Sequence, residues 1–227
     1  MSFPDEFHAY LKAHFPWSDL RCPYDLPGGA FLRFELGDEL PNGSMERVLQ
    51  ASERALTLLK WVFPTPDSPV WVAVYTYPKE ESPEDEKALN ACFFPEVLAT
   101  CSDEMLPDLT GEDPQAPIPP EANMRLRVAR TRFGAIYAHR LVRGIANHEM
   151  GFSPGVSARI FLYHAETHTA FYMYDDRGCL IWAPEAQALR EVYNLYGSWL
   201  VPDPLSKARF FSGKSPGDLA EPAPEQA

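Results

Sequence analysis

The sequence predicts an α+β fold, in which helices cover a mixed or antiparallel sheet. Three strand-forming runs over about residues 159–182 are joined by short polar turns, which is typical of a meander. A helical pattern at about residues 184–200 follows and is expected to pack on that meander. A second observation, a succession of strand, helix and strand between residues 30 and 77, predicts further sheet in the first half.

The last third of the chain supplies the clearest elements. Residues 159–165 and 170–174 are rich in aromatic and β-branched side chains and predict a hairpin. Residues 175–178, Asp-Asp-Arg-Gly, predict a type I turn closed by a glycine in the left-handed region, before a third strand at 179–182. Pro184 suits the first turn of the helix. Its apolar stripe comprises Leu189, Val192, Tyr193, Tyr196 and Trp199.

The first half contains two expected helices and two expected strands. Residues 4–15 and 45–63 space their apolar side chains helically, and Asn42-Gly43-Ser44 provides a turn and a cap for the second helix. Residues 30–37 alternate roughly as a half-buried strand, whereas residues 70–77 form a near-continuous β-forming run. We therefore expect a central strand at 70–77, buried on both faces, and a βαβ-like opening.

The middle of the chain is strongly acidic. Between residues 79 and 121 there are twelve acidic residues and two lysines, and five prolines interrupt the second part. We interpret residues 79–122 as a solvated, acidic and proline-rich insertion in a single domain spanning residues 1–211. The alternative is a docking flap for a basic partner. Residues 212–227, rich in proline, glycine and acidic residues, are expected to be a flexible tail.

A basic segment follows the acidic one. Residues 123–143 contain six arginines and no acidic residue, and they predict a strand at 124–131 before a helix at 136–147. The arginines are Arg125, Arg127, Arg130, Arg132, Arg140 and Arg143. One explanation is pairing with the acidic segment, and the other is an anion-binding surface.

Charge and composition restrict the partners. The net charge of -12 repels phosphate backbones and anionic lipid, so we expect no nucleic acid and no membrane surface, and a basic protein as the favoured partner. The four cysteines fit neither a zinc site nor a disulfide scaffold. The first fifteen residues do not resemble a secretion signal, and no window reaches the roughly 20 apolar residues of a membrane helix. A cytoplasmic location is expected, and the oligomeric state stays open.

The turn at Asp175, Asp176 and Arg177 is the candidate site. Two carboxylates beside a guanidinium can bind a cation, grip a basic side chain or serve acid–base chemistry, but they are also ordinary turn residues. We expect this turn to be exposed. Catalysis would need a second group, and no spacing links the turn to His148, His164 or Glu35, so no catalytic residue is assigned.

Two short stretches of the chain bear some likeness to metal-binding and cofactor-binding motifs. His164 and His168, with Glu166 between them, have a spacing that suits zinc on a helix, but they fall in the predicted hairpin. Pro27-Gly28-Gly29 precedes a strand, so it does not form a phosphate-binding or dinucleotide-binding loop. No metal and no cofactor are therefore expected.

The hairpin resembles a known family. The motif Tyr174-Asp175-Asp176-Arg177-Gly178, with the runs around it from Arg143 to Leu200, is similar to a bacterial family called domain of unknown function 3885. Residues 33–37 are similar to that family's early strand. The resemblance implies the fold class and a bacterial source, and no activity. Tyr174, Arg33 and Glu35 lie in these stretches and join the three turn residues as candidate binding residues. The chain departs from the family at Cys179-Leu180 and at Val201-Pro202-Asp203, where the family has polar residues.

Two functions agree with these observations. The first is a non-enzymatic binding protein that recognises a basic partner, for example an immunity-type inhibitor of that partner. The second is a hydrolase-like or small-ligand-binding enzyme with the Asp-Asp-Arg turn at the rim of its pocket. The acidic charge and the missing catalytic motifs favour the first.

Overall fold

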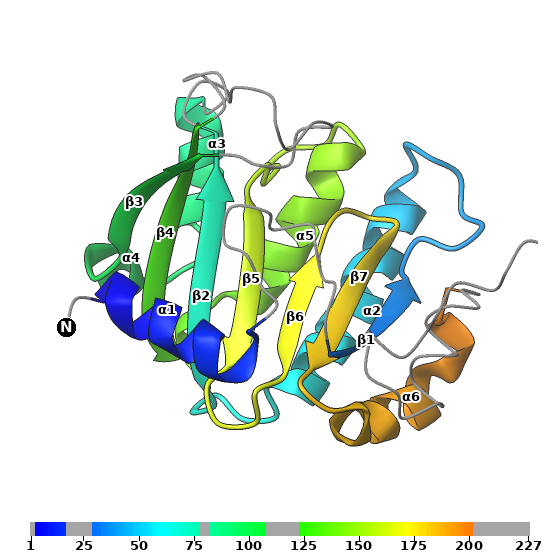
Figure 1. Cartoon of the computed structure of the whole chain (residues 1–227). Helices are drawn as coiled ribbons and strands as arrows, with labels where there is room; N and C mark the ends of the chain where they lie inside the picture. The colour runs from blue at the N-terminus through cyan, green and yellow to red at the C-terminus, as the bar shows by residue number, and fades with distance from the viewer. Residues whose placement is uncertain (1–2, 17–28, 78–81, 108–122, 202–227) are drawn as a thin grey trace, which may run out of the picture.

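The computed structural model describes residues 3–16, 29–77, 82–107 and 123–201 and places them around one seven-stranded sheet (Figure 1). The strands are β1 (Ala30–Glu35), β2 (Pro69–Thr76), β3 (Ser102–Pro107), β4 (Asn123–Arg132), β5 (Arg159–His164), β6 (Ala170–Met173) and β7 (Gly178–Ala183). The α-helices are α1 (Phe3–His14), α2 (Met45–Val62), α3 (Pro83–Asn90), α4 (Pro95–Ala99), α5 (Ala138–Glu149) and α6 (Arg190–Tyr196). The α+β class and the C-terminal meander are confirmed.

Every strand pair of the sheet is antiparallel. The strand order is β1-β7-β6-β5-β2-β4-β3, so β1 and β2 run in the same direction with three strands between them. The expected order of strand, helix and strand is confirmed, but α2 connects two strands that are not neighbours, so these elements do not form a simple βαβ unit. The meander fills the space between β1 and β2.

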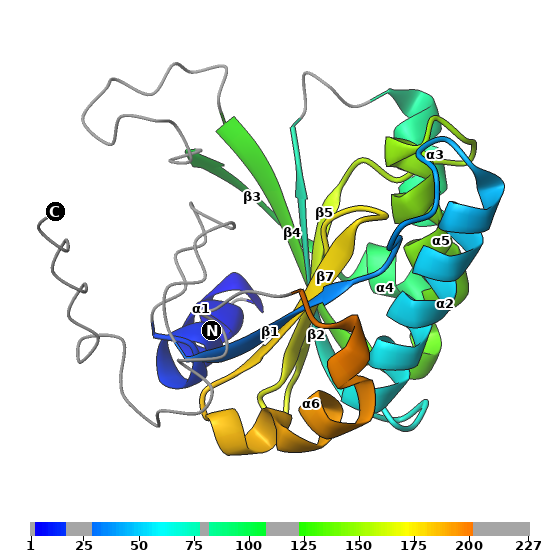
Figure 2. The same cartoon turned by 90° about the vertical axis from the view of Figure 1, so that its right-hand side faces the viewer.

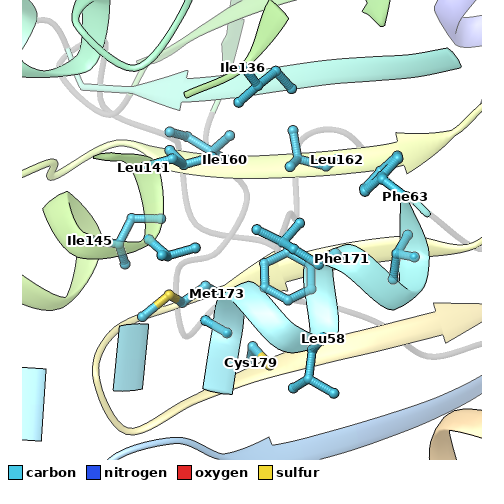
Figure 3. Packing of buried hydrophobic residues seen from close by; sticks show 14 of the residues in the cluster. Leu58, Phe63, Ile136, Leu141, Ile145, Ile160, Leu162, Phe171, Met173 and Cys179 are labelled. Carbon is cyan, nitrogen blue, oxygen red and sulfur yellow. The ribbon is translucent and has the colours of Figure 1, made fainter. Parts of the chain in front are cut away.

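Helices cover both faces of the sheet. Figure 2 shows α2 and α5 on one face and α1 on the other. Successive side chains along a strand point to opposite faces of the sheet, so each strand contributes to a hydrophobic core on either face. Figure 3 shows part of the core under α2 and α5, to which Leu58, Ile145, Ile160 and Phe171 contribute. On the α1 face, aromatic side chains dominate, including Trp71, Phe161, Tyr163, Tyr172 and Trp182.

Local sequence signals explain the main helix and the central strand. Gly43 adopts a positive φ of 77°, which only glycine takes at little cost, and Ser44 then caps α2 by accepting a hydrogen bond from the Arg47 backbone N–H at 3.2 Å. β2 is buried at every position from Val70 to Thr76. The expected cap and the expected central strand are confirmed.

The C-terminal helix is shorter than its apolar stripe predicts. Two 3-10 turns, Ala186–Leu189 and Gly197–Trp199, flank the seven residues of α6. Leu189 and Val192 are nevertheless fully buried, because a 3-10 turn also brings residues three apart onto one side. Beyond these turns Leu200 bridges to Phe34 and the chain returns to the edge strand β1.

Residues 82–107 differ from the solvated segment expected there. They form α3, α4 and the edge strand β3, and Leu89, Cys92, Phe93 and Val97 are buried against the core. These few apolar side chains, which lie among acidic residues in the sequence, are enough to pack the segment against the sheet and its helices. Residues 79–81, residues 108–122 and the expected tail at 212–227 lie outside the described residues.

The basic segment forms β4 and α5, and its arginines find partners. Asp103 of β3 accepts a hydrogen bond from Arg125 at 2.8 Å, and Glu86 of α3 lies 4.0 Å from Arg127. Pairing with the acidic segment is thus confirmed for these two. Arg132 instead pairs with Asp67 at 3.4 Å. Among the described residues, no helix is long and apolar enough to cross a membrane.

Candidate functional site

The predicted turn connects β6 to β7, but its two aspartates are not exposed. Asp175 is 6% exposed and Asp176 is fully buried, whereas the Arg177 side chain is 64% exposed. The expectation that the turn displays two carboxylates is therefore wrong, because each aspartate is taken up by a partner within the protein.

Asp176 points inward to Arg47 on α2. The Arg47 guanidinium donates to Asp176 Oδ2 through Nε, and through Nη1 to the carbonyl oxygens of Asp38 and Leu40 at 3.0 and 2.7 Å. A buried carboxylate needs such a partner because its desolvation is costly. Asp176 is thus a structural residue that ties the turn to α2 and to the loop after β1.

Asp175 organises the turn itself. Its Oδ1 accepts a hydrogen bond from the Arg177 backbone N–H at 2.7 Å, and its Oδ2 accepts one from Arg177 Nε at 2.8 Å. The side-chain hydrogen bond to Asp175 and the charge of that carboxylate raise the pKa of Arg177. This arrangement is common in turns, and the opposite charges of Asp175 and Arg177 cancel each other.

Gly178 does not have the left-handed conformation predicted for it, since it is not among the glycines with positive φ. A side chain is excluded there for another reason. A Cβ atom at Gly178 would lie 2.1 Å from the Tyr174 hydroxyl and 2.6 Å from the Phe34 carbonyl oxygen. The glycine lets Tyr174 lie across the hairpin toward β1.

Beyond the hairpin ladder, β5 and β6 separate. They pair at three positions, from Tyr163–Ala170 to Phe161–Tyr172, while β5 continues along β2 and β6 along β7. Figure 1 shows the two strands diverging toward α5. A cavity of about 910 Å³ lies here, and we call it the fork cavity. It is within the usual size range of ligand pockets, about 300–1,000 Å³.

The fork cavity combines aromatic, aliphatic and charged side chains. One group comes from β1 and the meander and another from α5 and the segment that leads into β5. The lining residues are Phe31, Arg33, Ile145, His148, Glu149, Val156, Ser157, Ala158, Arg159, Tyr172, Tyr174, Asp175, Arg177 and Leu180.

Arg33 is held in place by Tyr174. Its Nε donates to the Tyr174 hydroxyl at 3.0 Å, and the guanidinium lies 5.4 Å from the centre of that ring. Burial raises the pKa of Tyr174, and the hydrogen bond from Arg33 partly offsets this increase. In the described part of the chain, neither Nη of Arg33 has a protein partner, so both can donate to a ligand.

Arg159 makes a similar pair on the opposite side of the fork. Its Nη1 donates to the Tyr77 hydroxyl at 2.6 Å, and its guanidinium lies 5.0 Å from the Tyr77 ring centre. Burial lowers the pKa of Arg159, an effect that nearby Tyr172 opposes. Burial also raises the pKa of Tyr172 to about 12, so this phenol is protonated at neutral pH.

The structure brings together four of the six predicted site residues. Arg33, Tyr174, Asp175 and Arg177 line the fork cavity, whereas Asp176 is buried behind it and the exposed Glu35 is not part of its lining.

The two histidines that could have supplied a second group to the turn, His148 and His164, lie in different places. His148 lines the cavity. His164 is buried elsewhere, stacked on Phe63 at 5.5 Å. No group of three potential metal ligands occurs among the described residues.

Sequence reasoning missed Arg159, Tyr172 and Ser157 as lining residues. The first two lie in predicted strands, and the separation of β5 from β6 has no local signal. The strand alternation places Arg159 and Tyr172 on one face, but it does not show that a cavity opens there.

The fold and the cavity define an α+β protein with an antiparallel sheet that opens around a polar and aromatic pocket. The chain belongs to the family described as domain of unknown function (DUF3885), whose model matches residues 7–204. Comparisons with curated proteins and with solved structures found no match.

Proposed function

We propose that the protein binds a small anionic ligand in the fork cavity, with Arg33 as the anchoring residue. The observation that carries the proposal is the state of the Arg33 side chain, which is exposed. Its Nε donates to Tyr174 and so fixes the orientation of the guanidinium, while both Nη groups have no partner among the described residues. Such a preorganised arginine loses little conformational entropy when it binds a carboxylate or a phosphate.

The charges around the cavity support an anion. Among the described residues that line the fork cavity, Arg177 pairs with Asp175, Arg33 and Arg159 carry two further positive charges, and the exposed Glu149 carries one further negative charge. This is a local positive site in a chain of net charge -12. Phe31, Tyr172 and Leu180 add apolar and aromatic surface, which favours a ligand with a hydrophobic part.

Calorimetric titration with benzoate, phenyl phosphate and neutral benzamide tests this proposal. We expect the two anions to bind and benzamide to bind at least about tenfold more weakly, because the charge-assisted hydrogen bonds are lost. Arg33→Gln should abolish the preference for the anions. Arg132→Gln is the matched control, since Arg132 is an exposed, ion-paired arginine outside the cavity. Equal binding of benzamide and benzoate, or no binding of any probe, would show that the proposal is wrong.

A second candidate is binding of a basic protein. It rests on the net charge of -12 and on the exposed carboxylates of α3, Glu84 and Glu86. Capture from a host lysate at low and high salt tests it, and the expected result is a basic protein released by salt. Failure to retain any basic protein at low salt would contradict this candidate.

A further inference from the structure

A second, smaller cavity adjoins the fork cavity. It has a volume of about 230 Å³ and shares His148, Ser157, Ala158 and Arg159 with its larger neighbour. We call it the side cavity. Its other lining residues are Tyr75, Thr76, Tyr77 and Asp85, from the end of β2, the residue after it, and α3. A single ligand can therefore extend from Arg33, past Arg159, into the side cavity.

Thr76 gives the side cavity an unsatisfied polar atom. This residue is 4% exposed, and its buried Oγ1 has no hydrogen-bond partner among the described residues. A buried hydroxyl without a partner costs roughly 1–3 kcal/mol, and nearly all such groups in folded proteins are satisfied. A ligand group that reaches the side cavity can supply the missing hydrogen bond.

Asp85 gives the same cavity a carboxylate. Its Oδ2 accepts hydrogen bonds from the Ser82 backbone N–H at 3.2 Å and from the Ser82 hydroxyl at 2.8 Å, which completes the capping box of α3. Asp85 Oδ1 makes no hydrogen bond in the described part of the chain. The side cavity thus presents the Asp85 carboxylate and Thr76 beside the shared Arg159, whereas the fork cavity presents Arg33, so an acceptor for an amine lies at one end and a donor for a carboxylate at the other.

We propose that the ligand is a short peptide with free termini, whose carboxylate binds Arg33 and whose amino group binds Asp85 and Thr76. The proposal rests on the function proposed above and specifies its ligand class. A protonated amine supplies the donors that Asp85 Oδ1 and Thr76 Oγ1 lack. The C-terminal side chain of the peptide lies near Phe31, Ile145 and Leu180, so an apolar residue is favoured there.

The test uses the tripeptide Ala-Ala-Phe with its N-acetyl and C-amide derivatives, titrated calorimetrically into the full chain. N-acetylation removes the amine and amidation removes the carboxylate. We expect each derivative to bind at least about tenfold more weakly than the free peptide, since each loses a charge-assisted hydrogen bond.

Thr76→Val is the most informative variant. It removes a hydroxyl that has no partner in the part of the chain that the structure describes and keeps the side-chain shape, so the fold should be retained. We expect it to weaken the free peptide roughly three- to tenfold and to leave N-acetyl-Ala-Ala-Phe unchanged. Thr131→Val, on β4 and outside both cavities, is the matched control. Asp85→Asn should weaken the free peptide more than the acetylated one.

The outcomes separate the two proposals. If amidation weakens binding but N-acetylation and Thr76→Val do not, the anion site is retained and the peptide inference is wrong. If the free peptide does not bind, or if amidation has no effect, the peptide inference is wrong, and the titration with benzoate and phenyl phosphate decides independently whether the anion site at Arg33 is retained.

Discussion

Arg47 illustrates how a single buried cation can connect distant parts of a chain. Its guanidinium reaches Asp176 in the β6–β7 turn and the carbonyl oxygens of Asp38 and Leu40 after β1. Gly37 leaves room for it, because a Cβ atom there would lie 2.5 Å from the guanidinium carbon. The geometry of the fork cavity therefore depends on a residue that does not line it.

Replacing Asp176 with Asn should destabilise the protein strongly. The substitution keeps the size of the side chain but leaves Arg47, whose side chain is 9% exposed, without its charge partner. We expect a loss of roughly 3–5 kcal/mol in the free energy of unfolding, measured with guanidinium chloride. Asp67→Asn, which removes an exposed pair with Arg132, should cost at most about 1 kcal/mol. Equal losses for the two variants would contradict the role of Asp176.

Replacing Gly178 with Ala should affect both stability and the position of Arg33. The new methyl group would collide with the Tyr174 hydroxyl and with the Phe34 carbonyl oxygen, which belongs to the backbone and cannot rotate away. We expect a loss of roughly 1–3 kcal/mol on unfolding. Ala at Gly197, where a Cβ atom would have no neighbour within 4 Å, is the control. A Gly178→Ala variant as stable as the Gly197 variant would disprove this account.

At the scale of elements, α1 is attached to its face of the sheet by histidines as well as by apolar packing. Phe7, Leu11 and Phe15 are buried. In addition, the rings of His14 and His168 stack with centres 3.6 Å apart, which links α1 to the β5–β6 turn. At the end of β5, His164 Nδ1 accepts hydrogen bonds from the backbone N–H groups of Glu166 and Thr167 in this turn, at 3.3 Å each, so this nitrogen carries no proton in the folded protein.

His164 and His168 make the free energy of unfolding depend on pH. Burial lowers the pKa of both His164 and His168, and for His168 the charges of His14 and His164 lower it further. The unfolded chain therefore binds protons more readily, so the stabilisation is complete above the unfolded pKa of about 6.5 and decreases as the pH falls below it.

The corresponding measurement is the free energy of unfolding at pH 7.5 and pH 5.5 for the wild type and for His168→Asn. Asn suits the positive φ of 55° at this position and does not titrate in this range. We expect the variant to lose less stability on acidification than the wild type. An equal pH dependence in the two proteins would show that His168 does not contribute to it.

The sequence predicts the elements well where apolar residues repeat regularly. The strands at 159–164, 170–173 and 178–183 and the helix α2 follow from their periods. β3 was not predicted, because Asp103, Glu104 and Pro107 give it the composition of a loop. It forms a strand since β4 offers a free edge and Arg125 pairs with Asp103, and both depend on residues about twenty positions away.

At the scale of the whole molecule, the first and last strands are interleaved in one sheet. β1 pairs with β7, and β2 lies between β4 and β5. Neither half of the described chain can complete its hydrogen-bond ladders alone. The spatial order of the strands could not be deduced from the sequence, because alternation defines the faces of a strand and says nothing about its neighbours.

This interleaving predicts a single cooperative unfolding transition. Trp71 and Trp182 are buried on the α1 face, whereas Trp61 and Trp199 pack against the opposite core. Denaturation followed by tryptophan fluorescence and by circular dichroism should therefore give the same midpoint. Two separated transitions would indicate that the sheet consists of independently stable parts.

The candidate site was predictable in part at this scale. The family motif indicated Tyr174 and Arg33, and strand alternation places both on one face. The exposure of the aspartates was mispredicted, because Asp176 is buried against Arg47, more than a hundred residues earlier in the chain, and Asp175 is taken up by Arg177. Thr76 and Asp85 have no distinguishing sequence signal, since an unsatisfied hydroxyl is visible only when its surroundings are known.

The pairing of β1 with β7 has a consequence for synthesis on the ribosome. While the nascent chain emerges, β1 lacks the strand that it will hydrogen-bond until residue 183 has left the exit tunnel. Its exposed edge is then open to pairing with other chains, and contacts of such long sequence separation form slowly. Translation speed between β2 and β7 should therefore influence how much of the protein is recovered in folded form.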